Sequence, residues 1–152
     1  MSEEEKTTPG LDSYKAFVEK HWSGNPTELQ YVITSHLFAE SIIDEKLLKL
    51  FPHDSNIIKL GFANKLILLR SAGYGQRSLE LLTDLNKLRN KFAHNLDYEV
   101  KWSDIEKLGN KERYSKKDWE EKRLVVLRRM LSYAMGYTNG SINSFTLKHL
   151  VD

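Results

Sequence analysis

The sequence predicts an all-α protein, because apolar residues recur every three or four positions through most of the chain, which is the period of an α-helix. Only three prolines and eight glycines interrupt the 152 residues, and helix-starting and helix-ending residues separate the periodic segments. We therefore expect a single-domain helical bundle of about five main helices over residues 11–152, preceded by a flexible acidic tail over residues 1–10.

The first two helices follow from an apolar face and from a start signal. Residues 11–22 form a short amphipathic segment that stops at Ser23-Gly24, and its apolar side holds Tyr14, Phe17, Val18 and Trp22. A second helix starts at Asn25-Pro26-Thr27-Glu28, because Asn can cap free backbone N–H groups, Pro suits the first turn, and Glu at the third helical position reaches back. It runs to Phe51, since the residue before a proline disfavours helical geometry.

The middle of the chain predicts two further helices and an excursion. Residues 56–72 carry apolar residues at helical spacing and close at Gly73. Residues 76–94 form a fourth helix, with Asn95 as a left-handed cap. Residues 97–118 mix charges of both signs with large apolar residues, which disordered segments rarely do, so we expect an ordered excursion with one irregular helical piece.

The end of the chain predicts one more long helix. It covers residues 118–137, with Gly136 near its end. The residues from 138 onward are rich in Asn, Ser and Gly until four apolar positions favour a last short helix: Phe145, Leu147, Leu150 and Val151.

Composition excludes several classes of protein. The chain has no cysteine, which rules out thiolate zinc sites, thiol catalysis and disulfides and fits a reducing, cytoplasmic compartment. Its longest apolar runs span four residues, so we expect neither a secretion signal nor a membrane span. No motif points to a metal or a cofactor. The net charge of +2 leaves nucleic-acid binding open and dependent on a local basic patch.

Two helices carry polar residues within their apolar faces. In the second helix, His36 and Glu40 lie in the inward seam, four residues apart and able to touch. The apolar stripe of the fourth helix consists of Leu82, Leu85, Leu88, Phe92 and Leu96. At 100° per residue, Arg89 falls inside this stripe, about 40° from Leu85. We expect a semi-buried cluster in which Glu40, helped by Asp44, pairs with Arg89 across two packed helices. The alternative is that such a pair is purely architectural.

Asn90 and His94 lie in the last turns of the same helix. Their spacing of four residues lets the Asn90 amide bond the imidazole and aim it, although His94 can also serve only the helix dipole. Arg89 and His94 are about 140° apart around the helix at 100° per residue. Bringing them to one atom needs a distorted helix end, the reach of the Arg side chain, or a second copy across a twofold axis. We therefore expect a homodimer.

The stretch R-N-K-F-A-H over residues 89–94 resembles the signature of the HEPN superfamily. The order of upstream segments, Ile42-Ile43-Asp44-Glu45 and then Gly61-Phe62-Ala63-Asn64-Lys65-Leu66 through Ala72-Gly73, is similar to the mannitol-operon repressor family, an all-helical branch with HEPN-like cores. The resemblance covers residues 29–96.

The superfamily resemblance implies a helical bundle that commonly dimerises and, in active members, a metal-independent endoribonuclease that serves as a toxin or anti-phage effector. It implies that Arg89 stabilises phosphate charge, that His94 transfers protons or orients the scissile group, and that Asn90 supports both. His36, Glu40 and Asp44 would support the motif from the second helix.

Three functions stay open. A ribonuclease must hold RNA, and the sequence offers Lys122, Arg123, Arg128 and Arg129, with Tyr114 and Trp119 as stacking rings; the alternative is a solvated charged face, because acidic residues lie among these cations. The narrower resemblance implies a non-catalytic transcriptional regulator or scaffold acting through protein contacts. The third is the non-toxic antitoxin half of a two-gene pair, with a nucleotidyltransferase-like partner.

Overall fold

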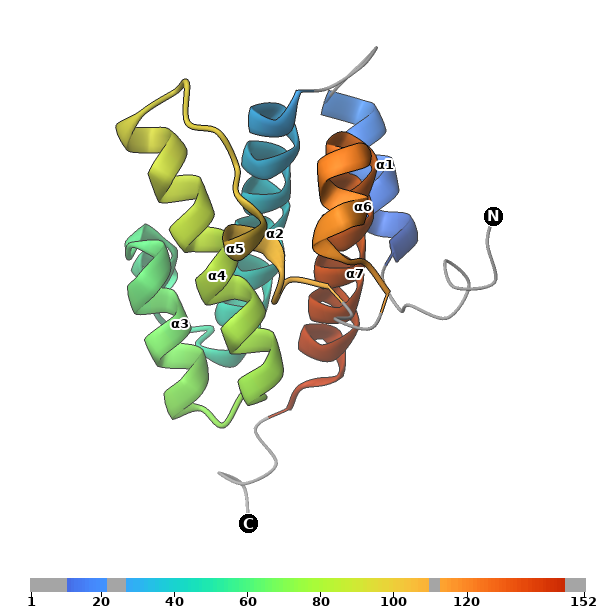
Figure 1. The fold of residues 1–152 in the computed structure, drawn as a ribbon. Coiled ribbons are helices and arrows are strands. Elements are labelled where there is room, and N and C mark those ends of the chain that lie inside the picture. The colour runs from blue at the N-terminus through green and yellow to red at the C-terminus, as the bar shows by residue number, and fades with distance from the viewer. Residues whose placement is uncertain (1–10, 22–26, 110–112, 147–152) are drawn as a thin grey trace.

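The computed structural model describes residues 11–21, 27–109 and 113–146, and this part of the chain is all-α without a strand, as predicted (Figure 1). Its elements are α1 (Leu11–His21), α2 (Glu28–Leu50), the short 3-10 helix η1 (Ser55–Lys59), α3 (Phe62–Ser71), α4 (Gln76–His94), α5 (Trp102–Ile105), α6 (Lys116–Glu121) and α7 (Arg123–Ser144). The expected tail over residues 1–10 lies outside the described residues.

Four helices, α1, α2, α4 and α7, surround the core, and α3 packs on the outside of α4 (Figure 1). The guanidinium of Arg123 forks onto the Glu28 carboxylate at 3.0 and 3.2 Å, so the first turns of α2 and α7 are adjacent and the two helices run in the same direction. The Tyr74 hydroxyl lies 2.6 Å from Ser141 Oγ, which joins the start of α4 to the end of α7. Helix α4 therefore runs antiparallel to α2 and α7.

The predicted apolar stripe of α4 is buried in this core. Leu82, Leu85, Leu88 and Phe92 are all buried, because they face α2 and α7. Leu96, which belongs to the same stripe on a helical wheel, is 71% exposed. The reason is that α4 ends at His94, so Leu96 no longer follows the helical period. Because one face of α4 supplies its contacts with the core, the opposite face can carry polar groups.

The N-cap of α2 lies two residues later than predicted. Thr27, not Asn25, is the N-cap: its side chain accepts a hydrogen bond from the Gln30 backbone N–H, and Gln30 Oε1 accepts one from the Thr27 N–H. This is a capping box of the expected kind with Gln in place of Glu. The predicted stop at Ser23-Gly24, together with Trp22, Asn25 and Pro26, lies outside the described residues. Helix α2 ends at Leu50 before Pro52, as predicted.

The helix predicted over residues 56–72 is broken in two. Leu60 and Gly61 are extended between η1 and α3, with ψ angles of 151° and 156°. In one continuous helix Ile57 and Phe62 would point about 140° apart at 100° per residue. The break lets both side chains reach the core, where both are buried.

The last helix is longer than its composition suggests. Helix α7 continues through Gly136 and Gly140 to Ser144, so the predicted end near residue 137 is wrong. The hydroxyls of Tyr74 and Ser78 each lie 2.6 Å from Ser141 Oγ, and these contacts give the polar residues of the last turns partners inside the protein. At its start, Lys122 leaves helical geometry and separates α6 from α7. The predicted terminal helix falls largely on residues 147–152, outside the described residues.

The excursion after α4 is ordered in the residues described. Asn95 is extended, with φ −151°, and is not the left-handed cap that we predicted. Asp104 then anchors the segment, because its carboxylate accepts hydrogen bonds from the Tyr98 hydroxyl, the Lys101 backbone N–H and the Lys91 ammonium. Helix α5 is the irregular helical piece expected here.

Replacing Tyr74 with Phe should lower the free energy of unfolding by about 1–2 kcal/mol, because it removes a buried hydroxyl that joins the start of α4 to the end of α7. Urea unfolding followed by circular dichroism measures this change. Tyr137→Phe is the matched control, since the Tyr137 side chain is exposed. Equal losses in the two variants would contradict the assignment of the Tyr74 hydroxyl as a structural link.

Candidate functional site

Arg89, Asn90 and His94 lie in the last turns of α4, and all three side chains are exposed. The prediction that Arg89 is semi-buried is wrong. The His36 ring packs 4.4 Å from the Phe62 ring and contacts Asn86, so α3 begins at the level of Asn86. Beyond that level the last turns of α4 extend past the start of α3 (Figure 1).

Glu40 and Asp44 pair with Lys65 of α3, and not with Arg89. The Lys65 side chain is 1% exposed, and its Nζ lies 2.7 Å from Asp44 Oδ1 and 3.2 Å from Glu40 Oε1. The sequence carries the signal that would have found this pair, because Lys65 falls between Phe62 and Leu69 on the buried face of its helix. Lys65, and not Arg89, is therefore the cation that links α2 to the helix packed against it.

His36 links this ion cluster to α4. It is buried, its Nε2–H donates to Asn86 Oδ1 at 3.1 Å, and its Nδ1 lies 3.9 Å from Glu40 Oε2, which confirms the predicted contact between His36 and Glu40. Burial lowers the pKa of His36 below its ordinary value of 6.5, and the nearby positive charge of Arg89 lowers it further. The lowered pKa favours the neutral imidazole, and Arg89 lies close enough to His36 to contribute to this shift.

The backbone of α4 does not by itself bring the motif residues together. The one hydrogen bond of Arg89 to a described residue goes from Nη1 to Asn90 Oδ1 at 3.2 Å, so Asn90 contacts Arg89 instead of His94. The helix stays regular to its end, where the Asn95 N–H donates to the Lys91 carbonyl at 3.1 Å. A distorted helix end is thus excluded as the way to bring Arg89 and His94 together. The reach of the Arg side chain and a second copy remain.

Of the four cations predicted to bind RNA, Arg123 already has partners. It forks onto Glu28, donates to the Val100 carbonyl at 2.7 Å and lies over the Trp119 ring at 4.3 Å. Trp119 itself is 2% exposed, so it is not a stacking platform for bases. Lys122, Arg128 and Arg129 are exposed. Tyr114 is only partly buried.

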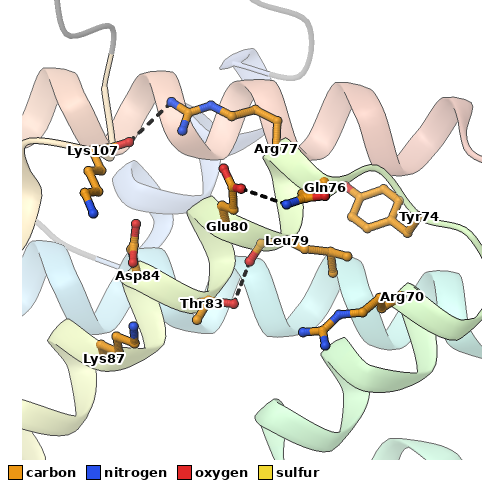
Figure 2. A pocket seen from close by; sticks show the side chains of 10 residues that line it. All are labelled: Arg70, Tyr74, Gln76, Arg77, Leu79, Glu80, Thr83, Asp84, Lys87 and Lys107. Carbon is orange, nitrogen blue, oxygen red and sulfur yellow. Dashed lines mark hydrogen bonds between the residues drawn. The ribbon is translucent and has the colours of Figure 1, made fainter.

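A groove that sequence reasoning missed lies along α4, with a volume of about 760 Å³ (Figure 2). Ten residues from three segments line it: Arg70, Tyr74, Gln76, Arg77, Leu79, Glu80, Thr83, Asp84, Lys87 and Lys107. Only the α4 residues could have been placed together from the sequence, because helical periodicity relates positions within one helix. Arg70 comes from α3 and Lys107 from the segment after α5, so the packing alone brings them to the groove.

Comparison of the chain with protein-family models, with curated proteins and with solved structures finds no match. Among the described residues no three His, Asp or Glu side chains are grouped so that they could hold a metal ion. None of the described helices has the length and apolar character needed to cross a membrane.

Lys65→Met should lower the free energy of unfolding by about 3 kcal/mol, because it leaves two partly buried carboxylates without their cation. Arg89→Met, which removes an exposed cation of similar size from α4, should change it by less than about 0.5 kcal/mol. Denaturant unfolding of both variants measures the difference. A larger loss in the Arg89 variant would show that the motif is architectural after all.

His36 should make stability depend on pH. Its folded pKa is lowered, so between that value and 6.5 the unfolded chain binds more protons than the folded one. The free energy of unfolding should therefore fall as the pH decreases through about 6.5 toward the folded pKa. His36→Gln keeps an N–H donor for Asn86 and should flatten this dependence in unfolding measured between about pH 7.5 and 5.5. Identical slopes for the two proteins would refute the assignment.

Proposed function

We propose that this protein is a metal-independent endoribonuclease that uses Arg89 and His94, with Asn90 in support, in a homodimer. The observation that carries the proposal is that two cations differ in burial and in their partners. Lys65 is buried and neutralises Glu40 and Asp44, whereas Arg89 is exposed beside Asn90. Because Arg89 holds no carboxylate of the described residues, its charge is available for a phosphate.

The chemistry needs only what these side chains supply. The RNA 2′-hydroxyl attacks the neighbouring phosphorus and loses its proton, while the bond from phosphorus to the 5′-oxygen breaks and that oxygen gains a proton. His94 can carry one of these protons, since imidazole exchanges protons near neutral pH. Arg89 can fork onto the phosphate oxygens as negative charge develops. The products are a 2′,3′-cyclic phosphate and a 5′-hydroxyl.

A homodimer supplies the convergence that one regular helix lacks. Arg89 and His94 point about 140° apart at 100° per residue, so a site that pairs Arg89 of one protomer with His94 of the other brings both groups to one phosphate. Leu96, highly exposed two residues beyond His94, offers an apolar contact for such an interface.

A second candidate function is a regulatory scaffold or the antitoxin half of a pair, which binds another protein. The exposed Leu37 on α2 and the exposed Leu96 beyond His94 favour this alternative, because exposed apolar side chains suit protein contacts. The two functions differ in one observable: only the ribonuclease loses a reaction when the motif is changed.

Purified wild-type protein should cleave single-stranded RNA in EDTA and leave 2′,3′-cyclic phosphate ends. Arg89→Ala and His94→Ala should each reduce the cleavage rate by about 10²–10⁴-fold without loss of stability, because they remove charge stabilisation and proton transfer from exposed positions. His53→Ala is the matched control, since His53 is exposed in a turn before η1. Absence of cleavage by the wild type would favour the scaffold.

Mixing the two inactive variants tests the arrangement across the dimer. A mixed dimer of Arg89→Ala and His94→Ala protomers contains one site with both groups intact if each site takes Arg89 and His94 from different protomers. Cleavage should then return to a substantial fraction of the wild-type rate after the two proteins are mixed and allowed to exchange. A mixture that stays inactive, although mixed dimers form, would place both groups of a site in one protomer.

A further inference from the structure

The groove along α4 concentrates positive charge. Arg70, Arg77, Lys87 and Lys107 line it against Glu80 and Asp84, a local net charge of +2 that equals the charge of the whole chain. Figure 2 shows the Arg70 guanidinium pointing from α3 toward α4, with Lys87 and Lys107 farther along the groove. This concentration supplies the local basic patch that nucleic-acid binding requires.

The four cations of the groove form few interactions within the described part of the protein. Arg77 donates a hydrogen bond to the Lys107 carbonyl at 3.3 Å, and none of the four forms an ion pair with a carboxylate in the described part of the chain. Glu80 receives its hydrogen bond from Gln76 at 3.2 Å. The cations of the groove can therefore bind an external anion without breaking an internal ion pair.

The groove leads to the proposed catalytic residues. Lys87 and His94 are seven residues apart on α4, so their positions differ by only about 20° around the helix and by about 10 Å along it. Lys91 lies between them on the same side, where it is exposed and pairs with Asp104. A chain of phosphates that binds Lys87 can therefore continue along α4 to His94.

Tyr137 of α7, which stacks on Tyr133, lies near Tyr74, a residue that lines the groove. The Tyr133 and Tyr137 rings are 6.2 Å apart at an interplanar angle of 28°, and Tyr137 is partly exposed. Tyr74 lines the groove and lies near Tyr137, whose phenol adds to the effect of burial in raising the pKa of Tyr74. Exposed aromatic rings beside cations are typical of proteins that bind single-stranded nucleic acid.

We propose that this groove binds the phosphate backbone of single-stranded RNA through Arg70, Arg77, Lys87 and Lys107, and that bases stack on Tyr137. The proposal rests on the proposed ribonuclease function for the choice of RNA, and it names single-stranded RNA as the substrate class. Unpaired bases are required because only they can leave their neighbours and stack on an aromatic ring. The groove replaces Arg128 and Arg129 of α7 as the site where the substrate is held.

Fluorescence anisotropy of a labelled single-stranded RNA tests this site in EDTA, with His94→Ala as the parent protein so that the probe stays intact. The groove variant adds Arg70→Gln and Lys87→Gln, a second variant adds Arg128→Gln and Arg129→Gln, and a charge-matched control adds Lys20→Gln and Lys59→Gln, two exposed lysines of α1 and η1. Circular dichroism checks that all four proteins are folded.

The groove variant should bind the RNA on the order of tenfold more weakly at 0.1 M salt. Its plot of log affinity against log salt should be shallower by about 1.4, because each of the two substitutions removes one cation from the phosphate backbone and each such cation contributes about 0.7 to the slope. The other two variants should match the parent. Adding Tyr137→Ala to the parent should weaken binding of the single-stranded RNA by about fivefold or more. It should leave the binding of a labelled double-stranded RNA, measured in the same way, unchanged.

Three results would overturn the proposal: unchanged affinity in the groove variant, an equal loss in the α7 variant, or competition by polyglutamate as strong as that by unlabelled RNA, which would identify an acidic protein as the occupant. The cleavage assay keeps the two proposals apart. Groove-dependent RNA binding by a wild-type protein that cleaves nothing refutes only the ribonuclease, whereas cleavage with unchanged binding by the groove variant refutes only the groove.

Discussion

The ion cluster of buried Lys65 with Glu40 and Asp44 is the interaction on which the rest of the arrangement depends. It holds α3 against α2, beside the packing of the Phe62 ring on the His36 ring. A lysine with 1% exposure is stable only beside its carboxylates, so the position of α3 along the bundle is set by where those carboxylates lie. Because α3 begins at the level of Asn86, the last turns of α4 extend beyond it and remain open to solvent.

Helix α4 joins the parts of the molecule that matter for function. One side supplies the leucines and Phe92 of the core, and the other side lines the groove and carries the motif. The core contacts give the exposed side chains a rigid base, which a site on a loop would lack. His36 and Asn86 connect the ion cluster to this helix, and Asp104 ties the following segment to it through Lys91. Contacts on both sides of the candidate site therefore hold α4 in position.

Much of the fold could be predicted because helices are encoded locally. The bounds of α4, Gln76–His94, agree with those expected from its periodicity, and α2 ends before Pro52 as its sequence indicates. The predictions failed where a tertiary contact outweighed a local preference. Helix α7 continues through glycines and polar residues because the hydroxyls of Tyr74 and Ser78 form hydrogen bonds with Ser141. The predicted third helix is interrupted at Leu60 and Gly61, which lets Ile57 and Phe62 both be buried.

The sequence by itself determined that the protein is a helical bundle, and it determined which residues share a face of each helix, since both follow from a period of 3.6 residues. It placed Arg89, Asn90 and His94 on one helix and His36 beside Glu40. Only the tertiary structure decided that Lys65 neutralises Glu40 and Asp44, that Arg89 is exposed, and that Arg70 and Lys107 join Lys87 in a groove. The physical reason is that contacts between helices depend on how far each helix is shifted along its neighbour, and the period within one helix carries no information about that shift.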